Sequence, residues 1–113
     1  MQIAERSAGK VKILDISGQI TLSKGSDQLL KDKVHSLVHQ GDTHILVNLA
    51  NVTAMDSAGL GELVAAYTTV SKAGGSMKLV NLTKRLHDLL SITKLLTVFD
   101  AYDSEPAALA TFK

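Results

Sequence analysis

Two strand-like apolar segments separated by a helical repeat constrain the fold of this chain more than any other feature. His44–Leu49 and Met77–Leu82 have strand length and are mainly aliphatic. Between them, apolar residues recur at helical spacing up to the Gly74-Gly75 pair; they are Leu60, Leu63, Val64, Tyr67 and Val70. This order predicts a β-α-β unit with parallel strands and a right-handed crossover. Because His44–Leu49 is apolar nearly throughout, we expect it to be a central strand buried on both faces.

The segment before this unit adds a hairpin and a helix. Ile3 to Ile20 has an extended pattern, and Ala8-Gly9-Lys10 is typical of a tight turn between two strands. From Ser26 or Asp27 to Gln40 the apolar residues follow helical spacing, and Gly41 is placed as the C-cap. We therefore expect a hairpin that joins the sheet, followed by a helix that covers one of its faces.

The segment after the β-α-β unit adds two helices and a short strand between them. Thr83 is placed to cap a third helix, and Leu95 to Phe99 is an apolar run that we expect to be a strand. Asp103 or Ser104 can cap a last helix with Pro106 in its first turn. The whole pattern predicts one α/β domain over residues 1–113, with a mixed sheet of about four to five strands and about four helices.

The composition narrows the classes of function. The 113 residues include 45% hydrophobic ones and no cysteine, which fits a single domain without disulfides, thiolate chemistry or a cysteine zinc site. The 12 basic and 11 acidic residues give a net charge of +1. They are scattered along the chain and form no basic stripe that would bind nucleic acid. No apolar stretch approaches a bilayer span, and the first residues lack the apolar core of a signal peptide. We expect a cytoplasmic protein.

The junction between the central strand and the next helix is the candidate functional site. It reads Met55-Asp56-Ser57-Ala58-Gly59-Leu60-Gly61-Glu62 and places an acidic residue and a hydroxyl at a helix start. Either side chain is a candidate helix cap. A phosphate on Ser57 would add a charge of about −1.5 to −2 at the positive end of the helix dipole.

The D-S-x-G-L-G sequence after a strand, with a Gly-Gly turn and a second strand downstream, resembles a STAS domain, and more narrowly the small bacterial anti-sigma factor antagonists. The resemblance runs from Val11–Ile20 to the closing helix after Asp103. It implies that Ser57, the serine directly after the aspartate, is phosphorylated by a partner kinase that is also the anti-sigma factor. Two positions depart from the family pattern: Thr21 stands where an aspartate is frequent, and Ala58 where a second Ser or Thr is frequent. Neither departure affects Ser57, the phosphoacceptor that the resemblance implies.

This resemblance implies a phospho-switchable binding module without enzymatic activity or cofactor. Unphosphorylated, it would sequester a serine-kinase anti-sigma factor and so release a sigma factor. The expected docking surface comprises Thr21, Leu22, Ser23, Asp56, Ser57, Ala58, Gly59 and Leu60. Two alternatives stay open: a structural subunit of a membrane transporter, and a component of a larger stress-signalling assembly with other STAS proteins as partners.

Other chemistries fit the residues less well. Gly59 and Gly61 belong to neither nucleotide-binding glycine pattern, and their simpler role is close packing at the turn. His35 and His39 lie four apart but lack further zinc ligands, so we expect no metal site and a solvated helix face. The G-x-S-x-G signature of a serine hydrolase is absent around Ser57.

Overall fold

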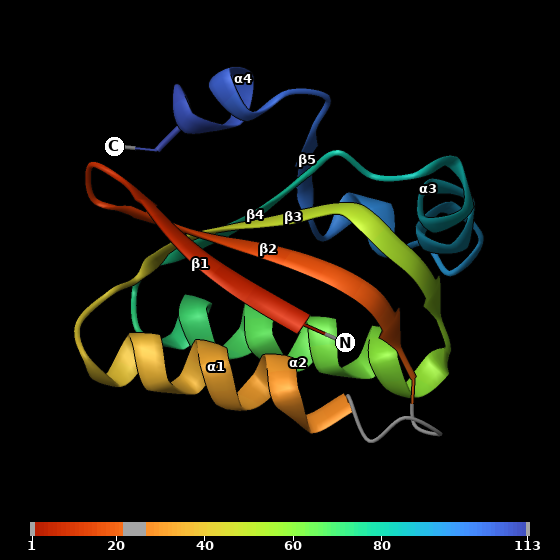
Figure 1. Cartoon of the computed structure of the whole chain (residues 1–113), viewed down its shortest axis with the longest axis horizontal. Helices are drawn as coiled ribbons and strands as arrows, with labels where there is room; N and C mark the ends of the chain where they lie inside the picture. Colours follow the sequence, from red (N-terminus) through yellow and green to blue (C-terminus); the bar gives the residue numbers. More distant parts are fainter. Residues whose placement is uncertain (1, 22–26, 113) are drawn as a thin grey trace.

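A five-stranded mixed sheet forms the centre of the computed structural model, which describes residues 2–21 and 27–112. The spatial order follows the chain: β1 (Gln2–Ala8), β2 (Val11–Ile20), β3 (His44–Met55), β4 (Ser76–Val80) and β5 (Asp100–Tyr102). β1 pairs antiparallel with β2, and all later pairs are parallel (Figure 1). The predicted hairpin, the parallel β-α-β unit and the central position of β3 are confirmed.

The helices cover the two faces of the sheet unequally. α1 (Asp27–His39) and α2 (Ser57–Lys72) lie side by side below one face, and α4 (Glu105–Leu109) lies above the other (Figure 1). α3 (Lys84–Ile92) contributes Leu86 and Leu90 to the core on the α1–α2 side. No helix of the described residues is long and apolar enough to cross a membrane.

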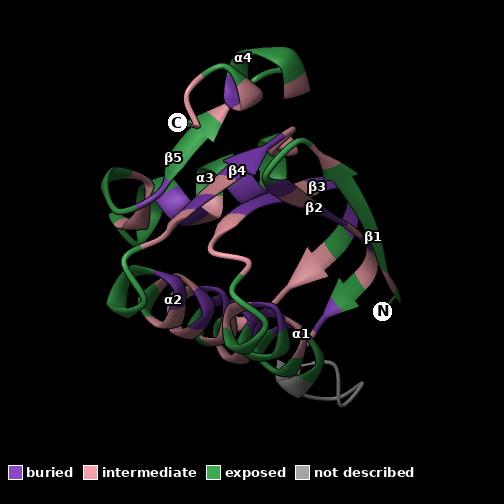
Figure 2. Ribbon diagram, turned by 90° about the vertical axis from the view of Figure 1, so that its left-hand side faces the viewer, coloured by how far each residue is buried: buried purple, intermediate pink, exposed green. Residues whose placement is uncertain are grey.

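Alternation along the strands divides the core into two clusters. On β2, Leu14 and Ile16 face the helices α1 and α2, whereas Val11 and Ile13 face α4. The buried side of α2 is turned toward the sheet (Figure 2), and its Leu63 is fully buried. Val64 and Tyr67 are partly buried and pack against the same core, as the helical spacing predicted.

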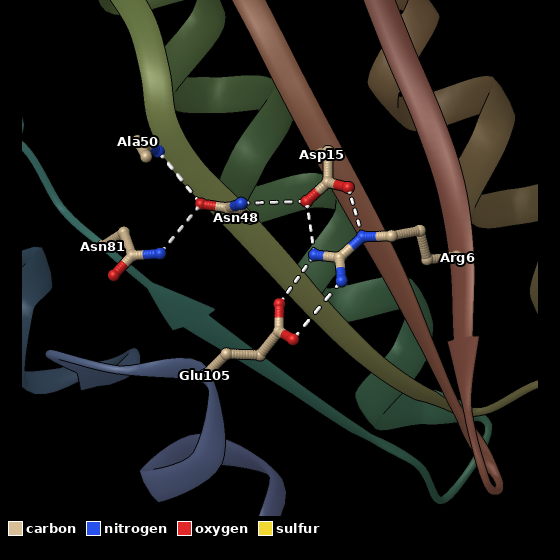
Figure 3. A network of polar contacts seen from close by, with 6 residues as sticks. All are labelled: Arg6, Asp15, Asn48, Ala50, Asn81 and Glu105. Atoms are coloured by element: carbon tan, nitrogen blue, oxygen red, sulfur yellow. Dashed lines mark hydrogen bonds and ion pairs between the residues drawn. The ribbon is translucent and has the colours of Figure 1, made fainter.

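A polar network ties the first strand to the last helix across the second face (Figure 3). The Arg6 guanidinium donates to Asp15 Oδ1 at 2.8 Å and to Glu105 Oε1 at 2.6 Å. The Asn48 amide also donates to Asp15 Oδ1, at 2.8 Å, and its oxygen accepts from Asn81 at 3.2 Å. The Arg6 hydrogen bond, assisted by Asn48, holds the pKa of the Asp15 carboxyl below its usual range.

The prediction of a strand at Leu95–Phe99 is wrong. Leu95–Thr97 forms the short 3-10 helix η2, and the last strand follows it at Asp100–Tyr102. Lys94 adopts a left-handed conformation with φ 63°, and the Val98 N–H then donates to the Leu95 carbonyl, which closes a turn. Phe99 is buried, so the apolar run anchors a turn to the core rather than extending the sheet.

Most of the other predicted ends of strands and helices are confirmed. β3 runs to Met55, beyond the expected end at Leu49, and alternates there between a buried Val52 and exposed neighbours. Thr83 and Ser104 cap α3 and α4, with Pro106 in the first turn of α4. α1 ends at His39, and Gly41 follows with φ 94°, which suits a glycine C-cap.

Candidate functional site

The strand β3 leads directly into the helix α2, and Asp56 is the single residue between them. Asp56 is the N-cap: its backbone is extended, and its carboxylate Oδ1 accepts from the Gly59 N–H at 2.8 Å. The Asp56 carbonyl accepts from the Leu60 N–H at 2.9 Å and starts the helical ladder. Of the two candidate caps in the sequence, Asp56 therefore caps the helix and Ser57 does not.

Ser57 is the first residue of α2, and its side chain is exposed. Ala58 is half-buried, whereas Gly59 and Leu60 are buried. The surface at this turn is thus made mainly by Ser57 and Ala58, with the exposed Gly61 one turn further on. Because the cap is supplied by its neighbour, the Ser57 hydroxyl is not required to start the helix.

Gly59 brings the end of β2 against this turn. A Cβ atom on Gly59 would lie 2.0 Å from the Ile20 carbonyl oxygen, a distance that no side chain can adopt. The Asp56 N–H also donates to this oxygen, at 3.4 Å. The predicted close-packing role is therefore confirmed for Gly59 but wrong for Gly61, where a Cβ atom would meet nothing within 4 Å. The Gly59 contact sets the first turn of α2 directly beside the last residue of β2.

This contact bears on Thr21, the first residue of the Thr21–Ser23 segment that we predicted as part of the docking surface. Thr21 comes directly after Ile20 and is half-buried, so the structure places it beside the Ser57 turn. Leu22 and Ser23 lie outside the described residues. The role of the Ile20 carbonyl had no signal in the sequence, because any residue supplies a carbonyl; the only hint was a glycine at position 59.

A hollow of about 500 Å³ lies between the end of β3 and α3. Met55, two residues before Ser57, lines it together with residues of α3: Lys84, Arg85, Asp88, Leu89 and Ile92. Arg85 donates to the Thr53 carbonyl at 3.3 Å and so fastens α3 to the end of β3. Of the basic residues in the sequence, the structure brings Lys84 and Arg85 to this side, whereas Lys72 lies at the far end of α2.

The residues weighed as metal ligands do not converge in the described part of the chain. His35 and His39 are both exposed on α1, as the helical pattern predicted. Within residues 2–21 and 27–112, no group of three or more His, Asp or Glu side chains is placed to hold a metal ion.

The chain is similar over nearly its whole length to known proteins. The family model described as STAS domain matches residues 2–108. The anti-sigma-B factor antagonist of Bacillus subtilis (strain 168) is 39% identical over 87 residues, 77% of each chain. The anti-sigma F factor antagonist of Paenibacillus polymyxa is 28% identical over 109 residues, which cover 96% of this chain and 92% of the relative.

Solved structures share the fold. The crystal structure of the protein TM1081 of Thermotoga maritima superposes with a TM-score of 0.87 at 25% identity, over 96% of this chain and 92% of that one. The phosphorylated form of the Bacillus cell fate determinant SpoIIAA has a TM-score of 0.71 at 17% identity and covers 94% of this chain and 96% of its own. The second likeness shows the fold alone.

Proposed function

The chain belongs to the STAS family and, within it, to the anti-sigma factor antagonists, and from this premise we propose that it is a phospho-switched antagonist with Ser57 as the phosphoacceptor. In the unphosphorylated state it sequesters an anti-sigma factor with serine kinase activity. This frees a sigma factor. Phosphorylation of Ser57 ends the interaction.

One observation carries this proposal: Ser57 is exposed at the first position of α2, while Asp56 performs the capping. The hydroxyl is therefore accessible to a kinase and dispensable for the helix. The antagonist relatives support the choice of an anti-sigma factor as the partner, because their names state what they oppose.

The switch has a simple electrostatic mechanism. Ser57 and Ala58 offer a small surface against which a partner can pack closely. A phosphate would place a charge of about −1.5 to −2 directly beside the Asp56 carboxylate. In a closed complex both anions would be deprived of water, which is costly unless a cation pairs with them. The phosphorylated form should therefore release the partner.

The proposed docking surface combines the Ser57 turn with the end of β2 and includes Thr21, Leu22, Ser23, Asp56, Ala58, Gly59 and Leu60. Gly59 and Leu60 are buried and contribute by holding the turn in place rather than by direct contact. The hollow beside Met55 and α3 is not part of this proposed surface.

A pull-down from the native cell lysate tests the proposal. Wild type, Ser57→Ala and Ser57→Asp serve as parallel baits, and mass spectrometry identifies the proteins retained. Ser36→Asp is the matched control, because Ser36 is exposed on α1 and lies outside the proposed docking surface. We expect wild type, Ser57→Ala and Ser36→Asp to retain a serine-kinase anti-sigma factor, and Ser57→Asp to lose it.

Other results would point to the other functions. Transporter subunits retained equally by all four baits would contradict the switch and favour a structural subunit. A particle of many STAS proteins, recognised by its size on gel filtration, would favour a stress-signalling assembly.

A further inference from the structure

A groove between α3 and β5 lies apart from the Ser57 turn. This α3–β5 groove has a volume of about 640 Å³ and is lined by Leu82, Lys84, His87, Leu96 and residues 99–103. β5 is the last strand in the order of the five-stranded sheet, and its residues line one side of the groove. The volume falls in the range of small-molecule sites, roughly 300–1,000 Å³.

One wall of the groove carries the Lys84 cation and the His87 imidazole, and the other carries two carboxylates. Lys84 and His87 lie three positions apart on α3 and therefore share one face of the helix. Asp100 begins β5 and Asp103 follows its end, so the other wall presents two carboxylates. All four side chains belong to exposed residues.

Among the described residues, no ion pair joins the two walls of the groove. His87 Nδ1 lies 4.0 Å from the carboxylate of Asp88 on the same helix, whereas Lys84, Asp100 and Asp103 belong to none of these ion pairs. Between the walls the lining is apolar, with Leu96 half-buried and Phe99 only 3% exposed. The groove thus has a basic wall, an apolar floor and an acidic wall.

The edge strand adds main-chain groups to the same space. The Tyr102 carbonyl accepts from the Asn81 N–H, so the main chain of Tyr102 is turned toward the β4 side. In a parallel ladder alternate residues bond to opposite sides, so the N–H and C=O of Ala101 are directed to the outer edge. Ala101 lines the groove.

We propose that the α3–β5 groove binds a small zwitterionic molecule with an apolar body, of the class of free apolar α-amino acids. The ammonium group faces Asp100 and Asp103, the carboxylate faces Lys84 and His87, and the apolar side chain lies on Leu96 and Phe99. The inference goes beyond the role of Ser57 and does not depend on it.

A titration of the ¹⁵N-labelled full chain by two-dimensional NMR tests this inference with three probes. L-phenylalanine carries both charges, 3-phenylpropionate lacks the ammonium and 2-phenylethylamine lacks the carboxylate. We expect L-phenylalanine to shift the amide signals of Leu96, Phe99 and Ala101 saturably. Each analogue should bind about tenfold more weakly, the usual effect of losing a charge-assisted hydrogen bond.

Two variants test whether the charged side chains of each wall contact the ligand. Lys84→Met and Asp103→Asn should each weaken L-phenylalanine about tenfold. Lys31→Met and Asp32→Asn, two exposed charges on α1, are the matched controls and should bind as wild type does. The absence of saturable shifts up to about 10 mM, ten times a millimolar dissociation constant, would overturn the proposal. Equal binding of all three probes would also overturn it, because the groove would then recognise the ring alone.

Discussion

The carbonyl oxygen of Ile20 occupies the space that a side chain on Gly59 would need, with 2.0 Å between that oxygen and the position of a Cβ atom. This contact joins the end of β2 to the first turn of α2. It therefore fixes where Ser57 lies relative to Thr21. These two residues belong to the two segments that form the proposed docking surface, the first turn of α2 and the end of β2.

Substitution of Gly59 by alanine should disrupt this contact. The backbone of α2 or of β2 must move, and we expect a loss of about 1–3 kcal/mol in the free energy of unfolding, as for other overpacked sites. Urea denaturation measures the change. Gly61→Ala is the matched control, because a Cβ there meets nothing within 4 Å. It should leave the protein as stable or up to about 1 kcal/mol more stable, since alanine is the better helix former. Equal losses for both variants would contradict the role of the Ile20 contact.

Removal of the Asp56 cap should weaken α2. Asp56→Ala leaves the Gly59 N–H without its carboxylate acceptor and should cost about 0.5–2 kcal/mol in urea denaturation. Asp56→Asn keeps an oxygen in the same place and should retain most of the stability. If the asparagine variant lost as much as the alanine variant, the charge of Asp56 rather than its capping bond would be the stabilising feature.

A negative charge at position 57 should be tolerated by the fold. Ser57 is exposed at the positive end of the helix dipole, so Ser57→Asp should shift the melting temperature by no more than about 3 °C. Differential scanning calorimetry checks this. The same variant should lose the anti-sigma factor in a direct binding measurement. A large drop in melting temperature would instead assign the Ser57 side chain a structural role.

The stabilising effect of Arg6 should depend on pH. Its hydrogen bond lowers the pKa of Asp15 in the folded state below the ordinary value of 3.8. A lowered folded pKa stabilises the protein above the ordinary value, and this stabilisation is lost as the pH falls through the folded pKa. Arg6→Met should therefore lower the free energy of unfolding at pH 7 and have a smaller effect in strong acid.

The size of this effect is limited by solvent. The Arg6 and Asp15 side chains are 46% and 26% exposed, so we expect a loss of at most about 1 kcal/mol at pH 7. Urea denaturation across the acid range measures it, with Lys31→Met as an exposed control. A cost for Arg6→Met that did not change with pH would show that Arg6 acts through the packing of its aliphatic stem.

Short-range patterns were sufficient for much of the fold and for the position of the candidate site. Helical spacing after Leu60 and the two aliphatic runs around it predicted the β-α-β unit, because period and length distinguish these elements locally. Thr83 was identified as a cap, and Ser104 as one of two candidate caps with Asp103, because a cap acts on backbone groups within one turn. The same logic placed Ser57 at a helix start, although it could not tell which of two adjacent side chains makes the capping bond.

Contacts between residues distant in sequence were decided only by the tertiary structure. The run Leu95–Phe99 was expected to be a strand, since a short apolar run has no period that separates a strand from a buried turn. The ion pair between Arg6 and Glu105 joins residues 99 positions apart and leaves no local pattern. By itself, the sequence determined the order of the elements and the serine at the turn, because these depend on neighbours along the chain. Packing of β2 against α2 decided how that serine is presented, because the Ile20 carbonyl and Gly59 meet only in the folded sheet.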